Sequence, residues 1–391
     1  MAKGFTNPYN FVDVDVLKAP EKKNKKDTVG INNAVSGVLH CKIIAKTSIA
    51  IPDAETEKKE SNGHKSYDFM SISKNGKKAF FIPGSSIRGV IRSVFETATD
   101  SCFSIFNETS GKGKKRIKYS VGEKACCDGI DLCEACSLFG IISKKDNNAI
   151  GSKIRISDAF LTKGNVDDFK TTVVPLGTPN SSYKKLYVMK EEIEEKKDNN
   201  HYYKARRKYY WHSDNNKQIY NNWKNGLKNN KSVKQKVNAS LQLAPKNTEF
   251  TFNIFYDNIS EEQLKQLIWA VNFWENNENS NLCHKIGHGK PVGLGSVKII
   301  VLENVKRVFS SNEYKEYVIT SEKVCDSSTP FSKNNKVVKQ LFNICKFDTS
   351  FNQSLNVRYP GVKWFKNYKK DDMKTPDIND VANGQRLPSL D

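Results

Sequence analysis

The stretch FFIPGSSIRGVIRSVFE at 80–96 joins a short apolar strand to a two-faced helix through a Pro-Gly-Ser-Ser turn. Its apolar residues recur at helical spacing and predict one buried stripe, made of Ile87, Val90, Ile91, Val94 and Phe95. Gly84 allows another backbone to approach closely, and the serines can accept from first-turn amides. Because a helix N-terminus attracts anions, we expect a phosphate site formed by Ser85, Ser86, Arg88 and Arg92.

The charge of the chain favours a nucleic-acid partner. The formal net charge is +20 at pH 7, although an AT-rich genome would also produce a merely lysine-rich surface. The basic residues are clustered, however, and in YYKARRKYYWH at 202–212 they alternate with aromatic rings. Cations beside stacking rings suit single-stranded nucleic acid. The candidates for binding RNA in this cluster are Lys204, Arg206, Arg207 and Lys208.

Two strand–helix–strand patterns, separated by a long polar stretch, indicate the fold class. They comprise strands at 36–52, 151–161, 250–256 and 297–301, with helices after Pro83 and after a capping box at Ser260. Joined by right-handed crossovers in one sheet, they predict an α+β protein with a ferredoxin-like core, the architecture of RNA-recognition domains.

We expect four segments along the chain. The first half of the core occupies 1–162 and includes a zinc knuckle at about 102–140. A basic insertion rich in Lys, Asn and Tyr follows at 163–240. The second half of the core occupies 241–308, and a C-terminal extension occupies 309–391.

The cysteines point to a metal. Cys133 and Cys136 have the spacing of a zinc knuckle, and Cys126 or Cys127 supplies a third thiolate. Adjacent cysteines rarely both ligate one ion, so Cys102 is the first candidate for the fourth ligand, with Cys126 beside Cys127 as the other. Buried thiols without a metal are the alternative, but this density of cysteines favours a structural zinc ion.

The stretch HKIGHGKPVGLGS at 284–296 is rich in glycine, yet it is not a loop for nucleotide hydrolysis. A Walker or dinucleotide loop follows a strand and opens a helix, whereas this stretch follows a helix and enters a strand. We expect a flexible loop that cradles the RNA backbone with its amides; a tight turn is the alternative. The residues expected to bind RNA here are His288, Lys290, Gly293 and Gly295.

Other classes of protein are disfavoured. No apolar stretch approaches the ~20 residues of a membrane-spanning helix, and the N-terminus lacks the apolar core of a signal peptide. Nine cysteines, an odd number, argue against a framework of disulfides. We therefore expect a cytoplasmic protein that does not bind membranes.

The order of IPGSSIRGVIRS, CEACSLFG, GSKIRISDA and GHGKPVGLGSVKI resembles the RAMP superfamily of CRISPR-associated proteins. More narrowly, NPYNFV, KARRKYYWH and GKPVGLGS resemble Cas-seven-like backbone subunits of type III, III-D-like or derived class 1 effector complexes. The resemblance implies copies that stack along a CRISPR guide RNA (crRNA) and present it to target RNA in antiviral defence. It implies a thumb-like loop at 53–79 that displaces a base. It also implies further partners, namely a Cas-five-like subunit and either a large signalling subunit or a separate nuclease.

The resemblance also raises the question of catalysis. Some of these subunits cleave target RNA with Mg²⁺ or a similar ion and an aspartate before the IPGSS strand. Asp68 has the matching position, with His64 as a weaker candidate, although Lys65, Ser66 and Tyr67 depart from the small residues usual there. The chain is then either a metal-dependent endoribonuclease or a scaffold that does not cleave. A guide-processing endoribonuclease that uses His284 or His288, and a generic RNA-binding protein, are the remaining alternatives.

Overall fold

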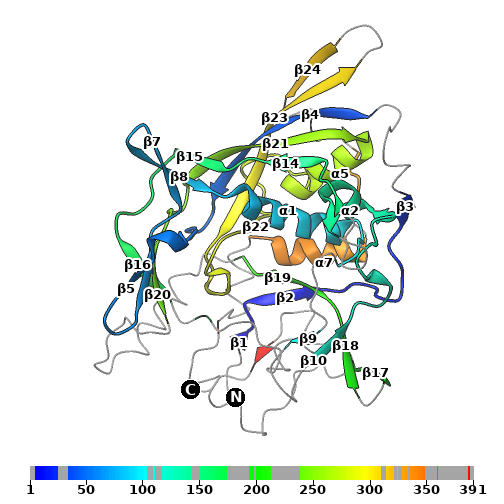
Figure 1. Cartoon of the computed structure of the whole chain (residues 1–391), viewed down its shortest axis with the longest axis horizontal. Coiled ribbons are helices and arrows are strands. Elements are labelled where there is room, and N and C mark those ends of the chain that lie inside the picture. The colour runs from blue at the N-terminus through cyan, green and yellow to red at the C-terminus, as the bar shows by residue number, and fades with distance from the viewer. Residues whose placement is uncertain are drawn as a thin grey trace.

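The computed structural model describes residues 5–24, 34–103, 109–110, 117–142, 149–173, 176, 193–197, 200–212, 238–309, 314–320, 324, 328–332, 335–347, 359 and 386–387. Most of the expected basic insertion at 163–240, and most of the expected C-terminal extension, lie outside these residues. The described part is a mixed α+β structure organised around one nine-stranded sheet (Figure 1). The predicted α+β class is therefore confirmed.

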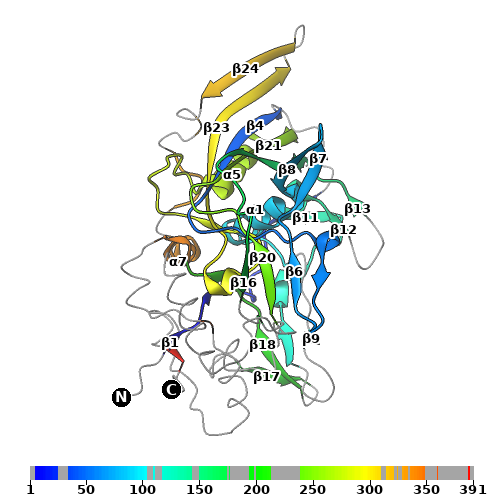
Figure 2. The same ribbon diagram turned by 90° about the vertical axis from the view of Figure 1, so that its left-hand side faces the viewer.

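The central sheet has the strand order β22-β23-β4-β21-β15-β8-β7, with β14 also on β21 and β24 also on β23. Its neighbouring strands pair antiparallel. The strands are β4 (Val35–Ala45), β7 (Ser71–Lys74), β8 (Lys77–Ile82), β14 (Ile154–Ile156), β15 (Ala159–Lys163), β21 (Glu249–Ile259), β22 (His284–Lys285), β23 (Ser296–Phe309) and β24 (Tyr314–Thr320). Figure 2 shows the β23–β24 hairpin extending beyond the rest of the sheet.

Helices cover one face of this sheet (Figure 1). They are α1 (Gly84–Ala98), α2 (Glu134–Phe139), α5 (Glu261–Asn272) and α7 (Lys336–Cys345). The predicted stripe of α1 is buried at Ile87, Ile91, Val94 and Phe95, and α1 packs against α5, α2 and α7. The capping box at the start of α5 is confirmed, since Ser260 Oγ accepts from the Gln263 amide and the Gln263 side chain accepts from the Ser260 amide.

Smaller sheets surround the core. They pair β1 (Phe5–Thr6) with β25 (Arg386–Leu387), β2 (Tyr9–Val12) with β19 (Arg207–Tyr210), β3 (Lys22–Asn24) with β11 (Asp131–Cys133), and β12 (Ile141–Ile142) with β13 (Ala149–Ile150). One four-stranded sheet contains β5 (Lys58–Lys59), β6 (Lys65–Tyr67), β16 (Lys170–Val173) and β20 (Ala239–Gln242). Another contains β9 (Thr109–Ser110), β10 (Ile117–Ser120), β17 (Ile193–Lys197) and β18 (Asn200–Lys204). Single 3₁₀ turns are η2 (Ala54–Thr56), η4 (Gly122–Lys124) and η5 (Lys290–Val292).

Two expected strands differ from the observed ones. The strand expected at 36–52 ends at Ala45. The backbone amide of Lys46 then donates to Ser296 O, and the chain leaves the ladder. The strand expected at 151–161 is divided into β14 and β15, because Asp158 turns away to accept from the Gly84 amide at 2.8 Å. The glycine-rich stretch lies between α5 and β23, as predicted. None of the helices in the described ranges is long and apolar enough to cross a membrane.

Candidate nucleic-acid interface

A cleft of about 690 Å³ lies where the N-terminus of α1, strand β19 and the glycine-rich loop meet. The strand β19 reaches this place by pairing with β2, so that two of the quoted motifs, NPYNFV and KARRKYYWH, lie side by side. Of the residues predicted to bind RNA, the cleft brings together Ser85, Ser86, Lys208, His288 and Lys290. Segments predicted separately to contact RNA therefore line one surface.

The cations of this cleft are crowded and partly withdrawn from water. Lys208 Nζ lies 3.7 Å from the ring centroid of Tyr9 and 5.0 Å from that of Tyr210. Burial, together with the charge of Lys290, lowers the pKa of Lys208 to about 8. Burial also lowers the pKa of Lys290. The negative charge of a phosphate placed between these ammonium groups would offset the energetic cost of their desolvation and their mutual repulsion.

Lys285, which belongs to the predicted glycine-rich stretch, also lines the cleft. Its Nζ donates to the carbonyls of Gly293 and Leu294 at 2.9 and 3.0 Å, and burial lowers its pKa to about 7. Within the described ranges, no carboxylate forms an ion pair with Lys285 or Lys290. The floor of the cleft is therefore electropositive without a compensating acid.

The glycine-rich loop is a fixed turn rather than the expected flexible cradle. Its amides are bonded within the protein, from Ile286 to Gly295 O, from His288 to Ala50 O and from Gly295 to Ser48 O. At Gly295 the φ is 77°, and a Cβ there would lie 1.9 Å from Ile286 O. The expectation of free amides at these positions was wrong, because the His288 and Gly295 amides bond to residues 50 and 48 and the Ile286 amide bonds within the loop. What it offers to the cleft are the side chains of His288 and Lys290.

The N-terminus of α1 also differs in detail from the prediction. Gly84 does allow a close approach, since a Cβ there would lie 2.3 Å from Ile156 O. However, the acceptor for the Gly84 amide is the Asp158 carboxylate rather than a serine, and Pro83 O accepts from the Ser86 amide. An acid at this position offsets part of the helix dipole. The attraction for phosphate therefore comes mainly from the lysines opposite.

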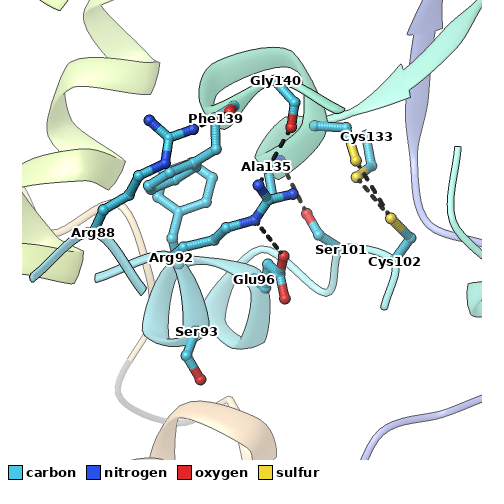
Figure 3. A network of polar contacts seen from close by, with 12 residues as sticks. Arg88, Arg92, Ser93, Glu96, Ser101, Cys102, Cys133, Ala135, Phe139 and Gly140 are labelled. Carbon is cyan, nitrogen blue, oxygen red and sulfur yellow. Dashed lines mark hydrogen bonds and ion pairs between the residues drawn. The ribbon is translucent and has the colours of Figure 1, made fainter. Parts of the chain in front are cut away.

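Arg88 and Arg92 make intramolecular contacts that the sequence did not predict (Figure 3). Arg88 donates to Phe139 O and to Ser152 Oγ, the latter at 3.1 Å. Arg92 pairs with Glu96 at 2.8 Å and donates to Gly140 O at 3.3 Å. Both guanidinium groups also lie 5.6 Å from the ring centroid of Phe139. The two arginines thus fasten α1 to the end of α2, and neither lines the cleft.

Arg207 has a similar structural role. It is buried, pairs with Glu96 at 2.8 Å, and donates to the carbonyls of Ser101 and Cys102 at 2.8 and 3.0 Å. The Arg206 guanidinium lies 4.3 Å from the ring centroid of Phe11. Lys204 ends β18, and its side chain lies outside the description. Of the four basic residues predicted in this motif, only Lys208 lines the cleft.

Four buried cysteines gather behind α1. The Sγ atoms of Cys102, Cys127, Cys133 and Cys136 all lie within 4.8 Å of one another. Cys102 Sγ lies 3.5 Å from Cys136, 3.7 Å from Cys133 and 4.0 Å from Cys127. A tetrahedron with zinc–sulfur bonds of about 2.3 Å has edges of about 3.8 Å. The cluster could therefore hold a metal ion such as zinc, with Cys102 rather than Cys126 as its fourth member.

The local chemistry of the cluster agrees with this fit. The Cys133 amide donates to Cys127 Sγ at 3.3 Å, which supports a negatively charged sulfur. Hydrogen bonding between the two thiols lowers the pKa of Cys133 and raises the pKa of Cys102. Metal binding needs thiolates, so the amide contact is the one that favours the ligating form.

The two candidate catalysts of target cleavage, His64 and Asp68, lie outside the cleft. His64 is buried, with Nδ1 2.8 Å from Asn238 Oδ1 and Nε2 2.9 Å from Ser240 Oγ. Asp68 pairs with Lys170 at 2.6 Å and with Lys78 at 3.7 Å, and the Lys170 contact lowers the pKa of Asp68. Asp68 is thus an ionised carboxylate and a weak proton acceptor, while His64 is a hydrogen-bonded core residue.

His284 lines the cleft but is held as a neutral ring. Its Nε2 donates to Val271 O at 2.8 Å, its ring stacks on Phe273, and burial lowers its pKa to about 4. A ring with that pKa is a poor general acid near neutral pH. This geometry argues against His284 as the catalyst of guide processing.

Two residues of the site had no place in the prediction: Glu96 and Asp158. The pairing of Glu96 with Arg92 could have been found, because the two residues are four apart on one helix. Asp158 has no comparable local signal, since its partner Gly84 is distant in sequence.

Replacing Arg207 by methionine should lower the free energy of unfolding by about 3 kcal/mol, because Glu96 would lose one partner in a buried site. Urea denaturation followed by circular dichroism measures this loss. Arg206→Met is the matched control and should cost less than about 1 kcal/mol. Equal losses in the two variants would contradict a special role for Arg207.

The comparisons with known proteins agree with this picture of the chain. The RAMP superfamily model matches residues 45–298. Similar solved structures include a chain titled "Type IV-B CRISPR Complex", with 14% identity, a TM-score of 0.33, and coverage of 71% of this chain and 92% of that chain. They also include Csc2 from Thermofilum pendens, with 12% identity, a TM-score of 0.36, and coverage of 88% and 89%. No curated protein matches the chain. The resemblance seen in the sequence is confirmed at the level of the family, and the chain belongs to the RAMP superfamily.

Proposed function

We propose that this protein is a crRNA-binding backbone subunit of a multi-subunit CRISPR effector complex, of a type III-like or derived class 1 system. Copies of it polymerise along the guide in a cytoplasmic ribonucleoprotein and present the guide to target RNA. The observation that carries this proposal is the convergence of β19, the N-terminus of α1 and the glycine-rich loop on one electropositive cleft. Membership of the RAMP superfamily supports it.

The connections of the core suit this function. The order β23-β4-β21-β15, with α1 between β4 and β15 in the chain and α5 between β21 and β23, supports a ferredoxin-like core made of two strand–helix–strand halves. In such a core the ends of several strands and one helix N-terminus meet at one edge. The cleft lies at that edge, and the loop at 53–79 adjoins it as the proposed thumb.

The cleft is suited to the RNA backbone rather than to base edges. Its charged groups are ammonium ions, which bind phosphates as point charges without reading sequence. The rings of Tyr9 and Tyr210 already flank Lys208 and orient it. Contacts of this kind would leave the Watson–Crick edges of the guide available for pairing with a target. That is what a guide-presenting scaffold requires.

The partners and metals follow from the same proposal. Further copies of the chain, a Cas-five-like subunit, and either a large signalling subunit or a separate nuclease would complete the complex. Zinc bound by the four-cysteine cluster would fix the segment around α2 in place. The ion pairs of Asp68 with Lys170 and Lys78 favour a scaffold over an endoribonuclease, because the carboxylate is occupied by cations. Mg²⁺-dependent cleavage at Asp68 stays a prediction.

The complex itself provides the first test. RNA that copurifies with the chain, expressed together with a CRISPR array, should be one size class protected in regular steps. Affinity for this RNA should fall steeply with salt, with a slope of about −0.7 per phosphate contact. Lys290→Ala should weaken binding about tenfold and reduce the slope by about 0.7.

Lys246→Ala is the control for that experiment, because it removes an exposed cation outside the cleft and should change little. Filter binding between about 50 and 200 mM salt gives both quantities. Heterogeneous cellular RNA in the purified sample, or no RNA at all, would contradict the proposal.

RNA affinity should also depend on pH through Lys208. The phosphate favours the protonated amine and so raises the pKa of Lys208 in the complex. The contribution of Lys208 is therefore complete below its RNA-free pKa of about 8, decreases above that value, and is gone once the pH exceeds the higher pKa of the complex. We expect affinity to fall about tenfold between pH 7 and pH 9. Lys208→Arg keeps its charge over this range and should abolish most of the dependence. The same fall in both proteins would assign it to another group.

The zinc site is tested by substitutions at two cysteines of the same segment. Cys133→Ser removes a proposed ligand and should cause loss of the metal, measured by elemental analysis, together with a lower melting temperature. Cys126→Ser should keep the metal, because Cys126 is not among the four cysteines that share the site. Full metal content in Cys133→Ser would exclude the assignment.

A further inference from the structure

A second cleft, of about 630 Å³, lies at the opposite end of β4 from the first. Figure 1 shows β14, β21, β4 and β23 lying side by side at this end of the sheet. The distance along β4 from Gly37 to Ala45 is roughly 26 Å at ~3.3 Å per residue. The lining shares no residue with the first cleft. It is therefore a separate feature of the surface.

A β-bulge opens this cleft. The ladder between β21 and β4 is regular as far as the pair of Tyr256 and Gly37, and then shifts so that Ile259 pairs with Val35. Asn258, within the bulge, has a left-handed φ of 51°. Bulges redirect side chains and are frequent beside functional sites. Here β21 gains one residue relative to β4, and Asp257 and Asn258 of the bulge line the cleft.

The floor of the cleft is apolar and includes an exposed aromatic ring. Arg155 pairs with Phe255, Phe255 with Val38, and Val38 with Val305 across four neighbouring strands. The side chain of Phe255 is 37% exposed, although Ile254 and Tyr256 beside it are buried. An exposed phenylalanine in the middle of a strand offers a flat surface on which a base can stack.

Cations flank this floor on both sides. The Arg155 guanidinium lies 5.9 Å from the ring centroid of Phe255, and Arg307 lies across the sheet, opposite Ser36. Lys153 is half-buried, donates to Asn258 O at 3.0 Å, and has a pKa lowered by burial, against the raising effects of Glu134 and Asp257. Among the lining residues, the acid is Asp257, which accepts from Ser36 Oγ at 2.7 Å. Three cations against one acid leave a net positive charge.

We propose that this second cleft is a further RNA contact, in which a base stacks on Phe255 and the phosphates on either side of it meet Arg155 and Arg307. The inference rests on the proposed function and extends it, because the RNA held in the first cleft continues across the sheet to the second. Single-stranded RNA is the favoured occupant, since an acidic peptide would use the cations but not the exposed ring. Guanidinium groups also match phosphate in a two-pronged geometry.

Fluorescence anisotropy with a labelled single-stranded RNA of about 20 nucleotides tests the stacking. Phe255→Ala should weaken binding about tenfold, whereas Phe255→Tyr keeps a ring and should stay within about twofold of the unchanged protein. The double variant Arg155→Ala/Arg307→Ala should reduce the salt slope by about 1.4, and Lys246→Ala should leave it unchanged. All of these side chains are exposed, and melting temperatures within a few degrees of the unchanged protein verify that the variants fold.

The outcomes separate this inference from the proposed function. Weaker binding by Lys290→Ala, together with unchanged binding by the second-cleft variants, would overturn the second site alone. Failure of the unchanged protein to bind RNA would remove both proposals. The second-cleft variants could instead lose self-association in the absence of RNA, as measured by sedimentation, while their RNA affinity stays intact. That result would assign the cleft to an acidic surface of another copy and so overturn the inference.

Discussion

The buried ion pair between Arg207 and Glu96 is the contact on which both candidate sites depend. Arg207 also donates to the carbonyls of Ser101 and Cys102, so one guanidinium holds α1, the segment that enters the cysteine cluster, and β19 together. A planar guanidinium makes these three contacts at once from donors held in a rigid fork. Because Lys208 is the next residue on β19, the position of its amine in the first cleft follows from the position of Arg207.

This arrangement connects the cysteine cluster with the cleft. Helix α1 presents Ser85 and Ser86 to the cleft at its N-terminus, and Cys102 lies four residues beyond its last residue, Ala98. Arg88 and Arg92 hold the middle of the same helix to the end of α2. A metal that orders Cys102 and α2 would therefore also order the frame of the first cleft. By linkage, such a coupling is reciprocal, so RNA bound as proposed would favour the ordered metal site.

The sequence predicted the elements that have a strong period and missed the contacts that join them. The stripe of α1 and the capping box of α5 are local patterns, and both formed as expected. Arginines on a helix face away from its apolar stripe look solvent-exposed in sequence, yet Arg88 and Arg92 meet carbonyls of residues 139 and 140, which no local pattern announces. The glycine-rich loop was placed correctly between a helix and a strand, but its amides bond to residues 48–50, far away in the chain. Cys102 was identified as a candidate because adjacent cysteines, such as Cys126 and Cys127, rarely both ligate one ion.

The electrostatics of the first cleft explain why these structural contacts are needed. Lys208, Lys285 and Lys290 line the same cleft, and within the described part of the chain no carboxylate forms an ion pair with Lys285 or Lys290. Repulsion among these cations opposes folding of the free protein. An acid placed among them would stabilise the fold, but it would also repel the phosphates that the cleft is suited to bind. The repulsion must therefore be opposed elsewhere, by contacts that phosphate does not disturb. The buried pair of Arg207 and Glu96, the arginine contacts of α1 and the internal bonds of the glycine-rich loop all lie behind the cleft and meet this requirement. The repulsion among cations thus lies at the proposed binding surface, and the contacts that oppose it lie behind that surface.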